Sequence, residues 1–102
     1  MRQTLYSFAI LLLHILRLIR PQIRKFIIDN FMFGNSNGVK DDTSFLGEGI
    51  IDSTGVLELV AFIEETFDLR VDDEELIPEN LDSIDNIVGY LQKKGVQSVK
   101  AA

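Results

Sequence analysis

Apolar residues recur at helical spacing in three segments, and each segment is predicted to form a helix with one buried face. The first occupies residues 21–33, and Pro21 suits its first turn because the missing N–H of proline is not needed there. The second occupies residues 53–67 and the third residues 83–94, with Gly95 as a stop. The three apolar stripes are, in order, Ile23, Phe26, Ile27 and Phe31; Val56, Val60, Ile63 and Phe67; and Ile84, Ile87, Val88 and Leu91.

A fourth, shorter helix is expected around residues 72–77, with Pro78 ending it. No segment alternates apolar and polar residues with the period of a strand. The predicted fold is therefore all-α, a small four-helix bundle with three main helices and one short helix. Residues 35–52 form a long connection between the first two helices, and a connection of this length in a small domain is often functional.

The first twenty residues are strongly apolar, and they allow three interpretations. The uncharged run from Gln3 to Leu16 is shorter than the roughly 20 residues that span a bilayer, and Arg17 and Arg20 follow it. It also lacks a small-residue cleavage site of the signal-peptide type. The segment is either an extra helix that packs on the domain or on a second copy, an interfacial membrane segment with its arginines at the headgroups, or a stretch without a role. The expected organisation is an apolar, basic extension over residues 1–20, a domain over residues 21–95 and a flexible tail over residues 96–102.

Composition excludes several kinds of chemistry. The 102 residues suffice for one small domain, and without cysteine the chain has no disulfide, thiolate metal site or cysteine nucleophile. His14 is the single histidine and lies far from the candidate serine, which argues against a Ser-His-Asp hydrolase. No phosphate-binding glycine loop and no EF-hand pattern occur. We therefore expect no catalytic residues and no metal site.

Charge is distributed unevenly along the chain. The net charge is −6, yet residues 1–25 carry five cations and no acid, which leaves five cations and sixteen acids, a net of −11, for the rest. Such an acidic body repels nucleic acid and attracts basic partner surfaces.

Ser53 is the candidate for covalent chemistry. Asp52 and Ser53 directly precede the second apolar stripe, so the serine is expected at the start of the helix, where it serves as an N-cap or as an exposed attachment point. The unpaired N–H groups and partial positive charge of a helix N-terminus favour a phosphate attached there. Gly55 in the first turn lets other groups approach the backbone near Ser53.

An ordered set of features resembles one known family. The long loop contains Phe45 and Leu46, the segment from Gly49 to Val60 reads GIIDSTGVLELV, and an acidic short helix and a closing helix with Ile87 and Tyr90 follow. Together, residues 21–94 resemble an acyl carrier protein or one of its relatives, the aminoacyl and peptidyl carriers. The resemblance implies a carrier, not an enzyme, with 4′-phosphopantetheine from coenzyme A attached to Ser53 and acyl groups held on that arm as thioesters.

The resemblance also implies roles for neighbouring residues and partners. Asp52 and Thr54 flank the attached cofactor. Partner enzymes, namely a pantetheinyl transferase, an acyl-loading ligase or acyltransferase and downstream synthases, bring basic patches to the acidic surface, and the protein is expected in the cytoplasm. The expected partner-binding residues are Glu58, Glu64, Glu65 and Asp68, and the expected lining of an acyl pocket is Phe62, Ile63, Val71, Ile87 and Tyr90.

Two positions depart from the family pattern. Thr54 replaces the usual leucine after the serine, and Gly55 replaces an acid of typical fatty-acid carriers. Both favour a specialised lipid or secondary-metabolite pathway. Three alternatives stay open: an aminoacyl or peptidyl carrier loaded by an adenylating ligase, an unmodified interaction protein in which Ser53 is only a cap, and a membrane-surface adaptor that works through residues 1–20.

Overall fold

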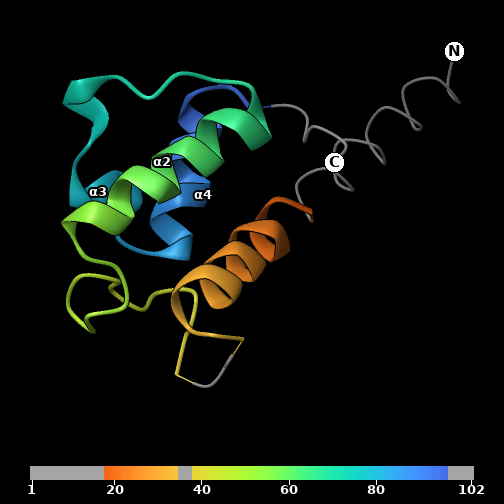
Figure 1. Ribbon diagram of the computed structural model, residues 1–102. Coiled ribbons are helices and arrows are strands. Elements are labelled where there is room, and N and C mark those ends of the chain that lie inside the picture. The colour runs from red at the N-terminus through yellow and green to blue at the C-terminus, as the bar shows by residue number, and fades with distance from the viewer. Residues whose placement is uncertain (1–17, 35–37, 97–102) are drawn as a thin grey trace, which may run out of the picture.

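The computed structural model describes residues 18–34 and 38–96, and the secondary structure in these residues is entirely helical (Figure 1). Residues 18–31 form the first helix. Then follow α2 (Ser53–Phe67), a 3-10 turn η1 (Asp73–Glu75), α3 (Pro78–Leu81) and α4 (Ile84–Lys93). The predicted all-α bundle is confirmed. Nearly all of the expected extension, residues 1–17, and of the expected tail, residues 97–102, lies outside the described residues.

The helix of residues 18–31 places one isoleucine stripe in the interior. Ile19, Ile23 and Ile27 are each at most 2% exposed, and their spacing of four residues puts them on one face. Helix is already present at residue 18, so the expected start at Pro21 and the expected division after residue 20 both fall inside it. Phe33 and Gly34, with φ values of 52° and 80°, follow the helix in the left-handed conformation.

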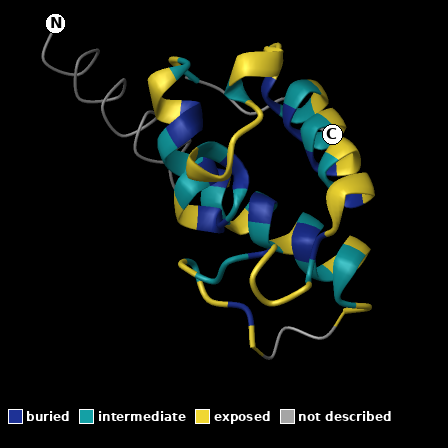
Figure 2. Cartoon of the chain, turned by 90° about the vertical axis from the view of Figure 1, so that its left-hand side faces the viewer, coloured by how far each residue is buried: buried dark blue, intermediate teal, exposed yellow. Residues whose placement is uncertain are grey.

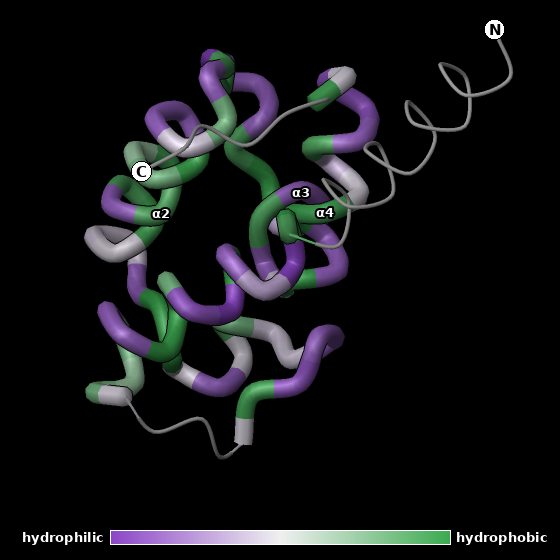
Figure 3. The backbone as a smooth tube through the Cα atoms, turned by 90° about the vertical axis from the view of Figure 1, so that its right-hand side faces the viewer, coloured by the Kyte–Doolittle hydropathy of each residue, from purple (hydrophilic) through white to green (hydrophobic). Residues whose placement is uncertain are grey.

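The helix α2 has the predicted bounds but a slightly rotated buried face. Its buried residues are Gly55, Leu59, Ile63 and Phe67, whereas Val56 and Val60 are only half-buried. Gly55 explains the rotation, because it packs closely against Phe31 of the first helix. The residues that follow it at intervals of four, Leu59, Ile63 and Phe67, lie on the same buried face. Figures 2 and 3 show the same pattern along the helices, with buried, hydrophobic positions recurring between exposed, hydrophilic ones.

The C-terminal part differs from expectation at Pro78. The proline opens α3 instead of ending a helix, since its fixed φ suits a first helical turn. The preceding acidic residues form only η1, and a capping box links Asp72 and Glu75. The start of α4 agrees with the prediction, because the Ser83 hydroxyl accepts the N–H of Asn86 at 3.0 Å. Ile84, Ile87 and Leu91 of α4 have no measurable exposure, and they join the core cluster formed by the other helices.

The long connection is fastened to the body at two places. Phe45 is 1% exposed, and its N–H donates to the carbonyl oxygen of Asp82 at 2.8 Å. The Asp82 carboxylate accepts the N–H of Leu46 at 2.9 Å and also the hydroxyl of Ser44. These bonds join residues far apart in sequence, so tertiary contacts hold the loop in a defined position.

Arginines of the first helix provide the second fastening. Arg20 lies 3.1 Å from a carboxylate oxygen of Asp41 and 2.5 Å from one of Asp85, and Arg24 also pairs with Asp41. Arg20 therefore connects the first helix with the long connection and with α4. Within the described residues, no helix is long and apolar enough to cross a membrane.

Candidate functional site

Ser53 is the first residue of α2 and lies at the end of a fixed loop. Just before it, Ile51 is 2% exposed, and the carbonyl oxygen of Phe45 accepts the N–H groups of Ile50 and Ile51 at 2.8 and 3.3 Å. Asp52, Ser53 and Thr54 are all exposed. The core thus holds the chain up to Ile51 and presents the next three residues to solvent. We call residues 51–56 the attachment end.

Asp52, not Ser53, caps the helix. Its backbone is extended, with φ −95° and ψ −177°, and its Oδ1 accepts the N–H of Gly55 at 2.8 Å. The interpretation of Ser53 as the N-cap was therefore wrong. An aspartate serves this position as well as a serine does. Within the described part of the chain, no side-chain hydrogen bond engages the Ser53 hydroxyl, so the structure of the helix start does not depend on it.

The start of α2 favours an anion. The N–H groups of the first helical residues have no acceptor within the helix, and the aligned peptide dipoles give this end a partial positive charge. The first turn of α2 contains no acidic residue, and the Asp52 carboxylate that precedes it accepts the N–H of Gly55. The residues at the attachment end therefore fit a phosphodiester on Ser53, with the backbone of Ser53 and Thr54 beside it.

Gly55 allows the first helix to touch the attachment end. A Cβ atom placed on it would lie 2.9 Å from Cε1 of Phe31 and 3.0 Å from Cγ2 of Ile51. Contacts that short do not occur in relaxed proteins, so only glycine fits without movement of its neighbours. The predicted close approach near Ser53 is thus present, and the groups that approach are an aromatic ring and a methyl group.

The four expected partner-binding acids fall into two kinds. Glu58 and Glu65 are exposed and two turns apart on α2, whereas Glu64 is half-buried and its Oε2 accepts the N–H of Val71 at 2.9 Å. Asp68 is exposed, adopts the left-handed conformation with φ 55° and ends the helix. Glu64 and Asp68 therefore also have structural roles at the end of α2.

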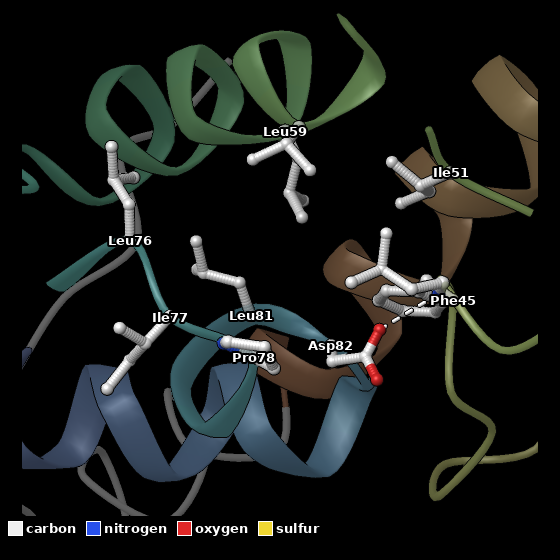
Figure 4. Close-up of a pocket in the computed structure, with 10 residues that line it drawn as sticks. Phe45, Ile51, Leu59, Leu76, Ile77, Pro78, Leu81 and Asp82 are labelled. Carbon is white, nitrogen blue, oxygen red and sulfur yellow. Dashed lines mark hydrogen bonds between the residues drawn. The ribbon is translucent and has the colours of Figure 1, made fainter. Parts of the chain in front are cut away.

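A pocket of about 100 Å³ lies beside α2 (Figure 4). Three segments line it: Phe45, Leu46 and Ile51 from the loop; Val56 and Leu59 from α2; and Leu76, Ile77, Pro78, Leu81 and Asp82 from the segment around α3. Val56 is one turn along α2 from Ser53, so the pocket adjoins the attachment end. Asp82 is the one charged residue among those that line it.

None of the five residues expected to line an acyl pocket lines this one. Ile63 and Ile87 have no measurable exposure, and Val71 and Tyr90 are at most 8% exposed, so these side chains are packed into the core. The fifth, Phe62, is half-buried and stacks on Phe26 at a centroid distance of 4.1 Å. Four of the expected residues belong to the buried core, whereas the pocket is lined largely by residues of the loop and of the segment around α3.

A cluster of hydrogen-bonded side chains around Glu75 was not predicted from the sequence. Its Oε1 accepts three hydrogen bonds: from the N–H of Asp72 at 2.9 Å, and from the Tyr90 hydroxyl and Lys94 Nζ, both at 3.0 Å. The backbone N–H of Asp72, and then the Lys94 ammonium, lower the pKa of Glu75 below its ordinary value. Burial, and then the Glu75 carboxylate, raise the pKa of Tyr90. No sequence motif joins these residues, because they come from η1 and the end of α4.

Comparison with known proteins gives the family. The model of the phosphopantetheine attachment site family matches residues 23–91. An acyl carrier protein of Bdellovibrio bacteriovorus is 34% identical over 77 residues, which cover 76% of this chain and 95% of the relative. One of Akkermansia muciniphila is 36% identical over 75 residues, covering 74% and 90%, and one of Buchnera aphidicola is 28% identical over 79 residues, covering 78% and 95%.

These matches confirm the expectation of a carrier that is not itself an enzyme, with covalently attached 4′-phosphopantetheine as its cofactor. They also imply interaction with a pantetheinyl transferase and with acyl-handling enzymes. On this evidence the chain belongs to the acyl carrier protein family.

Proposed function

We propose that Ser53 is the attachment residue and that the protein presents acyl groups as thioesters on the arm that Ser53 carries. The observation that carries the proposal is an exposed serine, in a first helical turn without acidic residues, within the segment matched by the family. Attachment forms a bond from Ser53 Oγ to phosphorus while the pyrophosphate bond of coenzyme A breaks, and adenosine 3′,5′-bisphosphate and the hydroxyl proton leave. When bound, the cofactor supplies the thiol that this cysteine-free chain lacks.

The residues beside Ser53 are proposed to hold the phosphate. The backbone N–H groups at the start of α2 face the anion, and the exposed Thr54 adds a hydroxyl where most carriers have leucine. Asp52 is proposed to act indirectly, since its carboxylate caps the helix and thereby fixes the position of Ser53. The acid-free first turn and Thr54 support service in a specialised pathway of lipid or secondary metabolism.

Partner enzymes are proposed to dock on the acidic side of α2. Glu58 and Glu65 are exposed and available to basic patches, while Glu64 and Asp68 add negative charge close by. Exposed ion pairs contribute only about 0–1 kcal/mol each, which suits complexes that form quickly and dissociate quickly. A carrier that visits several enzymes in turn needs such exchange, and we place this exchange in the cytoplasm.

The pocket supports an acyl cargo more than an aminoacyl one. Nine of the ten residues that line it are apolar, and the carboxylate of the tenth, Asp82, already accepts hydrogen bonds from Leu46 and Ser44. Nearly all of this surface offers an ammonium group no hydrogen-bond acceptor in exchange for the water that it would lose. An aliphatic chain loses nothing on the same transfer.

Intact mass spectrometry tests the attachment. The full chain is incubated with coenzyme A and a broad-range pantetheinyl transferase, next to Ser53→Ala and Thr54→Ala. We expect the mass of one phosphopantetheine to be added to the wild type and to Thr54→Ala, and not to Ser53→Ala. A gain that persists in Ser53→Ala, or no gain with several transferases, contradicts the proposal.

A further inference from the structure

One side of the pocket is a short segment with little regular structure of its own. Residues 72–78, which we call the pocket wall, contain only the three-residue η1 before Pro78 opens α3. Leu76, Ile77 and Pro78 of this wall line the pocket, and Figure 4 shows them across from Phe45 and Ile51. Leu76 and Ile77 are 40% and 42% exposed. A segment with so few buried contacts is free to move unless something fastens it.

Glu75 is what fastens the wall to the body. It directly precedes Leu76, and its Oε1 accepts the Tyr90 hydroxyl and Lys94 Nζ at 3.0 Å each, so it ties the wall to the last turn of α4 and the residue after it. The same oxygen accepts the N–H of Asp72, which closes the turn. Hydrogen bonds that involve charged partners are stronger than neutral ones. A second link, from Asn86 Nδ2 to the carbonyl oxygen of Pro78 at 3.0 Å, is neutral and exposed.

The size of the pocket limits what fits while the wall is fastened. An apolar cavity of about 150 Å³ holds benzene, which has six carbon atoms, so a pocket of about 100 Å³ takes about four carbons. The opposite side consists of core residues: Phe45, Ile51 and Leu59 are each at most 2% exposed and have no room to withdraw. Carbons beyond the fourth are therefore sheltered only if the wall moves outward and the contacts of Glu75 break; otherwise they extend into solvent.

We propose that Glu75 is a specificity-determining residue which, by tying the pocket wall to Tyr90 and Lys94, restricts the sheltered cargo to aliphatic acyl groups of about four carbons. Glu75 acts through the wall and has no contact with the thioester. The inference rests on the proposed function, since the cargo reaches the pocket on the arm attached to Ser53. Membership of the family does not fix the cargo of this carrier, and the inference names one residue that sets the length of the acyl chain.

A series of acylated proteins tests the proposal. Ser53 is loaded by a broad-range transferase with acyl-phosphopantetheine from saturated acyl-coenzyme A of two to ten carbons, and intact mass confirms each product. In the wild type, the unfolding temperature is expected to rise by on the order of 5 °C up to four carbons and then to stay level. In Glu75→Met, which removes the accepting oxygen at similar side-chain length, the rise is expected to continue to six or eight carbons, because the released wall admits a longer chain.

Two further variants keep the test decisive. Glu74→Gln changes the neighbouring exposed carboxylate and is expected to level off at four carbons like the wild type. Lys94→Met removes the charged donor next to α4 and is expected to shift the chain length at which the rise ends in the same direction as Glu75→Met, which covers the case in which the latter folds poorly. The proposal is overturned if the unfolding temperature stops rising at the same chain length in the wild type and in the variants of Glu75 and Lys94. It is also overturned if the unfolding temperature of the wild type keeps rising up to ten carbons. Absence of the mass gain itself would instead refute attachment at Ser53.

Discussion

The attachment end and the pocket wall lie on either side of one pocket and are held in different ways. Backbone groups and buried apolar residues hold the attachment end: the Phe45 carbonyl fixes Ile50 and Ile51, and the Phe31 ring packs against Gly55. The pocket wall is tied to α4 by the Glu75 carboxylate and by one neutral hydrogen bond from Asn86 to Pro78. The serine is therefore presented at a fixed place, while the cargo side depends on a few polar contacts that a substitution changes easily.

Asp82 lies between the attachment end and the pocket wall, so its loss is expected to have the largest effect on stability. It lines the pocket, and its carboxylate holds Leu46 and Ser44 of the loop that leads to Ser53. Asp82→Ala should lower the free energy of unfolding by about 2–3 kcal/mol, because two donors lose a charged acceptor. Urea denaturation measures this. Asp42→Ala, an exposed carboxylate on the same loop, should change little, and equal effects of the two would contradict the linking role.

Gly55→Ala probes the packing of the attachment end. The added methyl group would meet Phe31 and Ile51 at about 3 Å, and overpacking of this kind costs about 1–3 kcal/mol, partly offset by the roughly 1 kcal/mol that alanine gains in a helix. A net loss of about 1 kcal/mol is expected in urea denaturation. Gly89→Ala on α4, where nothing lies within 4 Å of the new atom, should instead stabilise by about 0.5–1 kcal/mol. Stabilisation by both substitutions would show that the contact with Phe31 is loose.

A pair of substitutions separates the cap from the attachment residue. Asp52→Ala should cost about 1 kcal/mol of stability, since the N–H of Gly55 loses its acceptor. Ser53→Ala should cost clearly less, because the serine does not cap the helix. Thermal unfolding of the two apo variants measures the difference. A larger loss of stability in Ser53→Ala than in Asp52→Ala would show that Ser53, and not Asp52, caps the helix.

The pocket wall should show its dependence on one carboxylate as a pH effect. The pKa of Glu75 is lowered in the folded state, so its ionised form stabilises the protein fully above its unfolded pKa of about 4.3, and this contribution is lost as the pH falls through the lower folded pKa. The difference in unfolding free energy between the wild type and Glu75→Gln should therefore be constant from about pH 7 to 5 and shrink at lower pH.

Glu74→Gln serves as the control for this titration, because it removes the neighbouring carboxylate and leaves the contact with Tyr90 and Lys94 in place. Its difference from the wild type should stay small over the same pH range. If the difference for Glu75→Gln did not shrink in acid, the carboxylate would not be what holds the wall.

The same contrast explains what the sequence could predict. Helical periodicity and the pair Asp52 and Ser53 are local signals, so the bounds of α2, the start of α4 and the exposed serine were predicted correctly. The assignment of the cap failed because both residues are good caps and only the backbone geometry decides between them. The bonds of Asp82 and Glu75 join residues 15 to 38 positions apart, and no local pattern encodes such pairs.

The most direct test of the central claim is to locate the cofactor on the intact protein. The holo form is digested, and tandem mass spectrometry assigns the modified residue among Ser44, Ser53, Thr54 and the other hydroxyl residues. Phosphopantetheine on Ser53 in every modified peptide is the predicted result. Its presence on Thr54 or on any other residue would contradict the role that we give to the attachment end.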